Sequence, residues 1–351
     1  MKKEKKRMQK STLRKLGASA VTAALALTGF MAAAPAQAAT KTIGIAYSLG
    51  GRDVPGFNQL AYIGVKPLLD KDKTIKLVES QDNPTATDDQ RAERLRLMAK
   101  RGANPIVVVG FTYAAALGKV AKEFPKIQWG IVDDSSVKAP NVQSIVFKEE
   151  EGSYLVGVAA ALTSKTKSVG FIGGVNTPLI AKFEAGFIAG VKSVDSSFTV
   201  KSTYISNFPD FSGFNDPAKG YEAAKGMYEN GADVVYAAAG GTGTGLHKAA
   251  SELGKWSIGV DADEATYPAH AAYTSTILTS MLKRVDVGVA AFVKDALAGT
   301  PTAGVKTWGI AEGGVGYTTT GGYIDDITSK IDEYSAKIAS GEVVVPTDPK
   351  A

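Results

Sequence analysis

The chain has 351 residues, no cysteine, two histidines, and 40 basic against 35 acidic side chains. The absence of cysteine excludes disulfides and thiolate metal sites, and His247 and His270 have no partner at a spacing typical of a metal site. We therefore expect neither a metal nor a cofactor. The formal net charge of +5 comes from the first 15 residues, so the rest of the chain lacks the basic character of a nucleic-acid-binding protein.

Residues 1–38 have the features of a secretory signal peptide. Eight lysines and arginines and one glutamate precede the apolar run LGASAVTAALALTGFMAAA, and the small-residue sequence AQAA follows. A membrane anchor is the alternative, but a run rich in Ala and Gly and followed at once by APAQA favours cleavage after Ala38. Cleavage would remove eight of the 40 basic residues and one of the 35 acidic ones, leaving a net charge near −2. We expect an exported protein, in the periplasm or at the cell surface, without a lipid anchor because Phe30 stands where a lipobox has its cysteine.

Beyond the leader, strand-like runs alternate with helical stretches. The runs TIGIAYSL, TIKLVES, PIVVVGF, QWGIVDD and VQSIVF are separated by helices predicted at about 57–70, 86–102 and 112–124. After a helix at about 150–164, the runs SVGFIGG, TVKSTYIS, DVVYAAA and WSIGVDAD follow the same pattern. Alternating βα units predict parallel sheets covered by helices, and the length predicts two domains.

The two halves of the chain open with similar sequences. Lys41 to Lys66 aligns without a gap on Lys167 to Lys192, and six positions are identical, including Phe57 with Phe183. The alternative is that any two βα units look alike. On either interpretation both phenylalanines lie where a loop enters a helix after a parallel strand, and ligands of open α/β sheets bind beyond the carboxyl ends of strands.

We expect two α/β lobes, each built on a doubly wound, mostly parallel sheet. The first comprises residues 40–147 and 259–303, the second comprises 148–258 and 304–345, and 346–351 form a tail. The crossovers are placed at SIVFKEEEG, WSIGVDADE and TWGIAEGGVGY, where strands end in turn residues. Two facing lobes without an evident catalytic set predict a binding protein that closes on a small molecule by hinge motion.

The glycine-rich stretch GGTGTGLHK follows a strand and opens a helix. It has no lysine at the P-loop position, and Gly241, Gly243 and Gly245 have the wrong spacing for a dinucleotide turn. What remains is a turn whose backbone amides donate to a ligand oxygen, or a tight strand-to-helix connection.

Enzyme functions find little support in the sequence. There is no G-x-S-x-G elbow, and the adjacent acids Asp133/Asp134 and Asp261/Asp263 suit a glycosidase only in principle, because such pairs are common at strand ends. The predicted leader and the lack of a helix-turn-helix segment exclude a transcriptional regulator, and nothing supports an adhesin. We expect a binding protein and not an enzyme.

Six blocks in order carry a family resemblance: GGRDVPGFNQLAY, FKEEEGSYLVGVAAALTSKTKSVGFIGG, KFEAGFIAGVK, GFNDPAKGYEAAKGMYENGADVVYAAAGGTGTG, IGVDADE and ILTSMLKRVDVGV. They resemble the basic membrane protein family, which includes purine nucleoside receptors. The resemblance implies the type I periplasmic-binding fold and a substrate-binding protein of an ABC importer. It also implies a nucleoside ligand and a membrane permease as partner, and we expect a monomer.

The resemblance further implies roles for single residues. In GFNQ, Phe57 would stack on the base and Asn58 would contact its polar edge; Phe183 in KFEAGF would line the second wall, and Phe214 in GFNDPAKG is a rival for stacking. Gly241 and Gly243 would approach the ribose, and Asp261 and Lys283 would hold its hydroxyls. An aromatic face suits a base, and a carboxylate paired with a cation suits a diol. Each phenylalanine has a core position as its alternative, Asp261 a turn, and Lys283 a solvated helix.

Two departures from the family pattern bear on the ligand. Val54 stands where members often have an acid, with Asp53 one position earlier, and Ala115 replaces the acid of GFxxxDAL. Asp133 or Asp134 would have to substitute. The alternative function is a sugar or autoinducer-type binding protein of the same fold, which would stack the ligand on tryptophan, although Trp129 and Trp256 lie in predicted strands.

Overall fold

The computed structural model describes residues 41–350 except 84 and 301–302. The expected signal peptide lies outside these residues. Among the described helices, none has the length and apolar character needed to cross a membrane.

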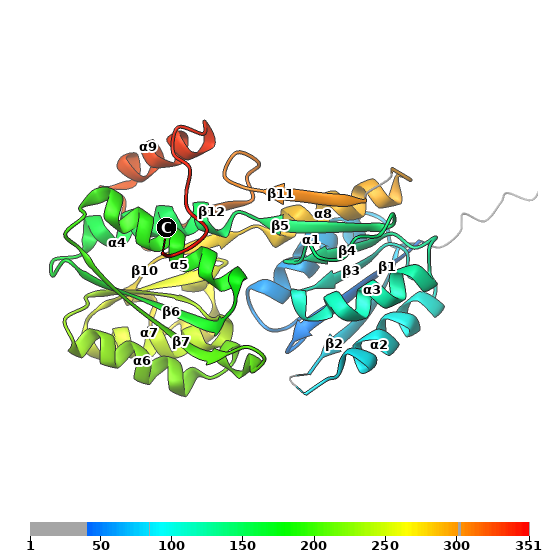
Figure 1. Cartoon of the computed structure of the whole chain (residues 1–351), viewed down its shortest axis with the longest axis horizontal. Coiled ribbons are helices and arrows are strands. Elements are labelled where there is room, and N and C mark those ends of the chain that lie inside the picture. The colour runs from blue at the N-terminus through cyan, green and yellow to red at the C-terminus, as the bar shows by residue number, and fades with distance from the viewer. Residues whose placement is uncertain (1–40, 84, 301–302, 351) are drawn as a thin grey trace, which may run out of the picture. The chain divides into compact units, whose positions relative to one another are not determined.

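The first lobe is built on a six-stranded sheet in which all strands are parallel. Its order is β11-β5-β4-β3-β1-β2, with β1 Thr42–Leu49, β2 Lys76–Asp82, β3 Ile106–Val109, β4 Trp129–Val132, β5 Val142–Phe147 and β11 Gly304–Trp308. Helix α1 (Phe57–Lys71) packs beside α8 (Val285–Leu297), and α2 (Asp88–Lys100) packs beside α3 (Ala114–Glu123) (Figure 1). The strands β3, β4 and most of β5 are buried apolar runs, as expected for a sheet covered on both faces.

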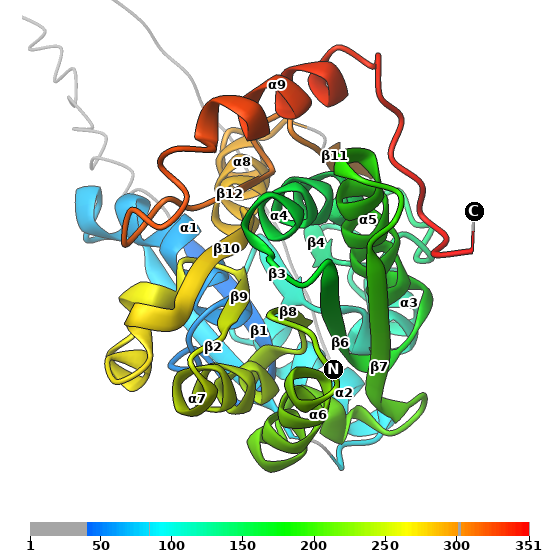
Figure 2. The same ribbon diagram turned by 90° about the vertical axis from the view of Figure 1, so that its left-hand side faces the viewer.

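The second lobe repeats this arrangement. Its sheet order is β12-β10-β9-β8-β6-β7, with β6 Ser168–Asn176, β7 Thr199–Asn207, β8 Val234–Ala238, β9 Trp256–Asp261, β10 Ile277–Lys283 and β12 Val315–Tyr317. Only the edge strand β12 runs antiparallel among these. Helices α4 (Glu149–Thr163) and α5 (Pro178–Val194) pack together, as do α6 (Pro217–Glu229) and α7 (Gly243–Leu253), and Figure 2 shows the two pairs on opposite sides of the sheet. Helix α9 (Thr328–Ala339) packs against α4. The expected two-lobed, mostly parallel α/β fold is confirmed.

Two of the expected boundaries between the lobes are wrong, because β10 and β11 belong to other sheets than expected. The chain was expected to leave the second lobe at residue 259, yet β9 and β10 pair in parallel in the second sheet, and the crossing follows Lys283. Strand β11 pairs with β5 in the first sheet, so the return lies after Trp308 and not at 304. The physical reason is the β9–β10 connection, which consists of 3-10 turns at 264–276 in place of a helix, so the βα pattern breaks while the sheet continues.

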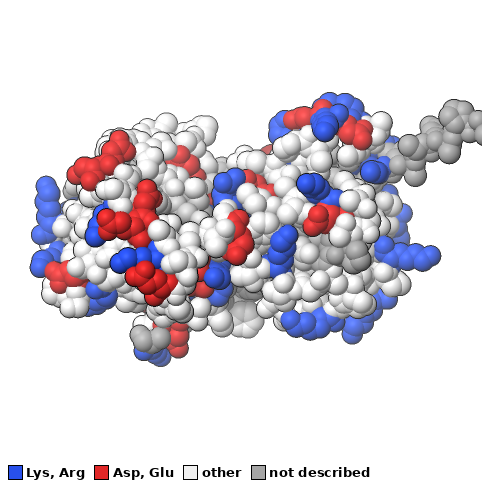
Figure 3. Space-filling view, turned by 90° about the horizontal axis from the view of Figure 1, so that it is seen from above, with Lys and Arg blue, Asp and Glu red and all other residues white. Residues whose placement is uncertain are grey.

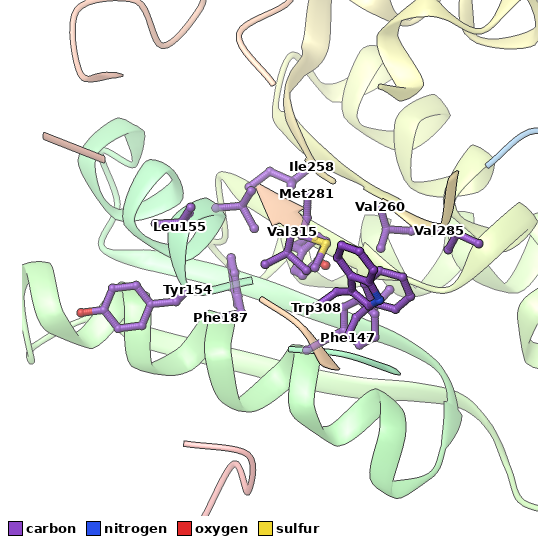
Figure 4. Packing of buried hydrophobic residues seen from close by; sticks show 14 of the residues in the cluster. Phe147, Tyr154, Leu155, Phe187, Ile258, Val260, Met281, Val285, Trp308 and Val315 are labelled. Atoms are coloured by element: carbon purple, nitrogen blue, oxygen red, sulfur yellow. The ribbon is translucent and has the colours of Figure 1, made fainter. Parts of the chain in front are cut away.

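The core is continuous across the crossing strands. One cluster of buried apolar side chains contains residues of both sheets. Figure 4 shows Phe147 and Trp308, from the ends of β5 and β11, beside Met281 of β10 and Val315 of β12. Packing of these buried side chains therefore holds the ends of the crossing segments in place, in addition to the covalent connections of the chain.

Candidate functional site

A buried lysine links the two lobes. Lys283, the last residue of β10, has its Nζ 2.5 Å from Oδ2 of Asp133, which follows β4 of the first lobe. The same Nζ lies 3.2 Å from Oε1 of Glu149, the first residue of α4. Asp261 ends β9 and pairs in register with Leu282, directly before Lys283. We call Asp133, Glu149, Asp261 and Lys283 the charge cluster.

Both aspartates have an unusual backbone. Asp133 and Asp261 have φ values of 64° and 67°, in the left-handed region. In a residue with a Cβ, such a conformation costs about 1–3 kcal/mol and persists only when its surroundings impose it. The strands β4 and β9 occupy equivalent places in the two sheets. The fold thus places a strained aspartate at the same point of each lobe, and strain of this kind gathers at ligand sites.

The charge cluster holds more negative than positive charge. Burial raises the pKa of Asp133 to about 6 and that of Asp261 to about 7, Lys283 opposes both shifts, and neighbouring carboxylates add to them. Burial disfavours the charged form of Lys283, but attraction to Asp133, Glu149 and Asp261 raises its pKa above the usual range. Lys283 therefore stays charged, and burial holds the pKa values of both aspartates above the usual range of a carboxyl group.

Two buried oxygens of the charge cluster accept no hydrogen bond. They are Oδ1 of Asp133 and Oε1 of Glu149, and the second of these faces Lys283 Nζ at 3.2 Å as an ion pair only. A buried acceptor without a donor costs about 1–3 kcal/mol. A ligand that presents hydroxyl groups would supply the missing donors.

Three aromatic rings surround the lysine. The Nζ of Lys283 lies 5.1 Å from the ring centroid of Phe57 and 5.5 Å from those of Phe147 and Phe183. Phe57 begins α1 in the first lobe and is half-buried, whereas Phe183 in α5 is only 3% exposed. The two phenylalanines that align between the halves of the sequence thus meet at one ammonium group.

Phe214 and the glycine-rich turn form a separate group in the second lobe. A Cβ at Gly174, near the end of β6, would lie 2.5 Å from the ring of Phe214, so the ring lies directly on this glycine. A Cβ at Gly241 would lie 2.9 Å from Oδ1 of Asn215, and one at Gly243 would lie 3.9 Å from the carboxylate of Glu264. The neighbours of these residues are residues of the second lobe.

Asn58 and Asp53 lie elsewhere than expected. The carboxamide oxygen of Asn58 accepts from the backbone N–H and the hydroxyl of Ser48, at 3.2 and 3.0 Å, and its nitrogen donates to the carbonyl of Leu49 at 2.9 Å. These bonds hold the loop between β1 and α1, so Asn58 positions Phe57 in place of contacting a base. The side chain of Asp53 is 91% exposed and pairs with Arg52.

Comparison with known proteins decides the family. The profile of the family described as "ABC transporter substrate-binding protein PnrA-like" matches residues 44–349. The chain belongs to this family. It therefore binds a small-molecule substrate and works with a transporter permease.

Relatives and solved structures agree with the family. The chain is 36% identical to "CD4+ T-cell-stimulating antigen" of Listeria monocytogenes, over 88% of both chains. It is 35% identical to "ABC transporter nucleoside-binding protein BmpA" of Lactococcus lactis subsp. cremoris, over 71% of this chain and 72% of the relative. A solved ABC transporter solute-binding protein from Aeropyrum pernix K1 matches with a TM-score of 0.73 at 25% identity, over 88% and 95% of the two chains. The resemblance to the basic membrane protein family and the type I periplasmic-binding fold are thus confirmed.

Several residues of the candidate site were not expected from the sequence. Glu149 is 1% exposed and pairs with Lys182 at 2.8 Å, and Lys182 also donates to the carbonyl of Phe147 at 3.0 Å. The triple glutamate of FKEEEG is the signal that was available, since three acids at the start of an apolar helix stand out. Phe147 offers no signal of its own because a buried strand end is an ordinary place for phenylalanine.

Two further groups lie near the site. Phe111, after β3, lies 5.8 Å from Phe211 of the second lobe in an edge-to-face arrangement, and Phe211 contacts the exposed Phe208 in the same way. His247, Glu264 and His270 are buried, with potential ligand atoms within 4.8 Å of one another. The histidines thus do have a partner, but each donor atom already meets a protein group, so we assign no metal.

Proposed function

We propose that this substrate-binding protein captures a nucleoside for an ABC importer, and that the charge cluster binds the ribose. The observation that carries the proposal is the buried Lys283 between carboxylates of both lobes, two of whose oxygens accept no hydrogen bond. A ribose diol has two hydroxyl donors for carboxylate oxygens and two oxygen acceptors for an ammonium group. The name of the Lactococcus relative supports a nucleoside as ligand.

The base would stack on Phe57. This ring is half-buried and lies beside Lys283, and an aromatic face suits a flat ligand. Phe183 and Phe147 are nearly fully buried and serve as the wall behind the lysine. Phe214 would cover the base from the second lobe, and the backbone N–H of Gly241 would donate to a ligand oxygen, whereas the N–H of Gly243 already donates to the carbonyl oxygens of Gly240 and Gly241.

Closure follows from the distribution of the polar groups. Asp133 belongs to the first lobe, whereas Asp261 and Lys283 end strands of the second. A ligand that bonds to both aspartates binds the closed arrangement better than an open one, and therefore shifts the population toward it. We also propose that the chain is exported, carries no lipid anchor, acts as a monomer and catalyses no reaction.

A sugar is the alternative ligand and would require an aromatic platform from tryptophan. Trp129 and Trp308 are buried in the first lobe, and Trp256 packs against Tyr323. These positions favour the nucleoside.

A thermal-shift panel tests the proposal. The purified protein is screened against inosine, guanosine, adenosine, cytidine, free bases, ribose and glucose. A ligand at 100 times its Kd should stabilise the protein by about 2.7 kcal/mol. We expect shifts with purine nucleosides and none with ribose or glucose. Shifts with sugars alone would contradict the nucleoside and support the alternative.

A further inference from the structure

The conformation of Asp261 depends on one glutamate. The backbone N–H of Val260, directly before Asp261, donates to Oε1 of Glu264 at 2.9 Å. The backbone N–H of Glu264 in turn donates to the hydroxyl of Ser280 in β10 at 3.1 Å. Glu264 therefore connects the end of β9 with the middle of β10, the strands that carry Asp261 and Lys283.

The other carboxylate oxygen is held by a histidine. Nε2 of His247 lies 2.6 Å from Oε2 of Glu264, and Nδ1 lies 2.8 Å from Oγ of Ser257 in β9. Ser257 donates its single hydroxyl hydrogen to the carbonyl of Thr276 at 3.1 Å. Its oxygen can thus only accept from His247, so Nδ1 carries a hydrogen. Two atoms 2.6 Å apart also need a proton between them, so the pair holds one hydrogen on Nδ1 and one between Nε2 and Oε2, and its net charge is zero.

The second histidine completes the group. Nδ1 of His270 lies 3.1 Å from the carbonyl oxygen of Glu264, and Nε2 lies 3.1 Å from the hydroxyl of Thr244 in α7. Since a carbonyl only accepts, Nδ1 carries a hydrogen and donates to it. Burial, followed by the effect of His247, lowers the pKa of His270, which favours the neutral ring with Nε2 as the acceptor.

We propose that Glu264, oriented by His247, is a positioning residue that holds Asp261 in its strained, ligand-facing conformation. This inference rests on the proposed role of Asp261 in nucleoside binding. Replacing a buried pair of ionisable groups by apolar residues is often neutral or favourable for stability, so stability alone does not account for a histidine and a glutamate at this point. A left-handed aspartate one residue from the bonded Val260 does account for it, because that conformation needs support.

The test compares two substitutions of Glu264 by nucleoside affinity. In Glu264→Gln the amide oxygen still accepts from Val260, and the amide N–H donates to a neutral His247, so the geometry is kept. Glu264→Ala removes both bonds. We expect Glu264→Ala to raise the Kd for inosine about 10- to 100-fold and Glu264→Gln to change it less than about threefold.

A control variant removes a hydrogen bond to β9 far from Asp261, and so separates effects on positioning from effects on stability. Tyr228 is buried and donates to the carbonyl of Trp256, at the opposite end of β9, at 2.7 Å. Tyr228→Phe should lower the melting temperature and leave the Kd unchanged. If Glu264→Ala does not fold, Ser280→Ala removes the acceptor for Glu264 N–H and is expected to weaken binding about three- to tenfold.

Failure of the inference and failure of the proposed function give different results. If the wild-type protein binds no nucleoside, the proposed function fails, and crystal structures then test the inference alone. Asp261 should keep its positive φ in the wild type and in Glu264→Gln and lose it in Glu264→Ala. Unchanged affinity or an unchanged φ in Glu264→Ala would overturn the inference, as would equal losses of affinity in both variants.

Discussion

Lys283 and Asp133 form an ion pair of 2.5 Å between the last residue of a strand in one lobe and the residue after a strand in the other. Lys283 ends β10, and α8 begins two residues later at Val285, where the chain crosses to the first lobe. One side chain therefore joins the lobes at a crossing point and lies beside two further carboxylates. A ligand that bonds to this pair would act on the hinge directly.

Removing the lysine should destabilise the fold. Lys283→Met leaves Asp133, Glu149 and Asp261 buried without their shared cation, and breaking a buried pair in this way costs about 3–5 kcal/mol. Urea unfolding measures the loss. The matched control is Lys225→Met, whose exposed pair with Glu229 should contribute under about 0.5 kcal/mol. Similar free energies of unfolding for the two variants would contradict the stabilising role of Lys283 in the charge cluster.

The stability of the ligand-free protein should fall between about pH 4 and pH 7. Burial raises the pKa values of Asp133 and Asp261 to about 6 and about 7, above about 3.9 in an unfolded chain. The folded protein then binds more protons than the unfolded chain across this window, so stability decreases as pH rises. We expect Asp261→Asn to reduce this decrease, measured by urea unfolding at pH 5, 6, 7 and 8. A variant curve parallel to that of the wild type would rule out a raised pKa at Asp261.

The affinity for nucleoside should change with pH in the opposite direction. Ionised carboxylates are the better acceptors for ribose hydroxyls, and a carboxylate with a folded-state pKa of about 6 or about 7 ionises near neutral pH. Calorimetric titrations with inosine at pH 5 and pH 8 should show tighter binding at pH 8. Tighter binding at pH 5 would mean that the protonated acids donate to the ligand.

Phe57 and Phe183 should respond differently to truncation. Phe57→Ala should cost about 1–3 kcal/mol of binding through lost stacking, with a small effect on stability, while Phe57→Tyr retains the stacking face. Phe183→Ala should cost about 3–5 kcal/mol of stability because this ring is buried. Affinity and melting temperature are measured on each variant. Unaltered affinity in Phe57→Ala would assign stacking to another ring, with Phe214 next to be tested.

Two glycine-to-alanine substitutions with opposite expected effects test helix packing, one where α5 meets α4 and one in α6 as a control. A Cβ at Gly190 would lie 2.0 Å from the carbonyl oxygen of Tyr154, so Gly190→Ala should destabilise the protein by about 1–3 kcal/mol. At Gly226, inside α6, a Cβ meets nothing within 4 Å, and alanine should stabilise by about 0.5–1 kcal/mol. Thermal unfolding of both variants checks the opposite signs.

The sequence allowed the fold class and part of the site to be predicted, because these depend on local patterns. Buried strands, helix ends and the aligned Phe57 and Phe183 are visible in single segments. The β9–β10 pairing was missed since its connection contains no regular helix. The bond between Asp133 and Lys283 joins residues 150 positions apart, and no spacing rule could pair them.

Figure 3 shows the distribution of charge on one face of the molecule. Lysines, arginines and acidic side chains are mixed over its left-hand part, whereas basic side chains predominate along its lower right-hand rim.

Isothermal titration of inosine into the wild-type protein and into Asp261→Asn tests the central claim most directly, with ribose as the control ligand. We predict one site per chain in the wild type, a Kd at least about tenfold weaker in the variant, and no heat with ribose. Absence of binding by inosine, guanosine and adenosine, or equal affinity in both proteins, would contradict a ribose site at the charge cluster.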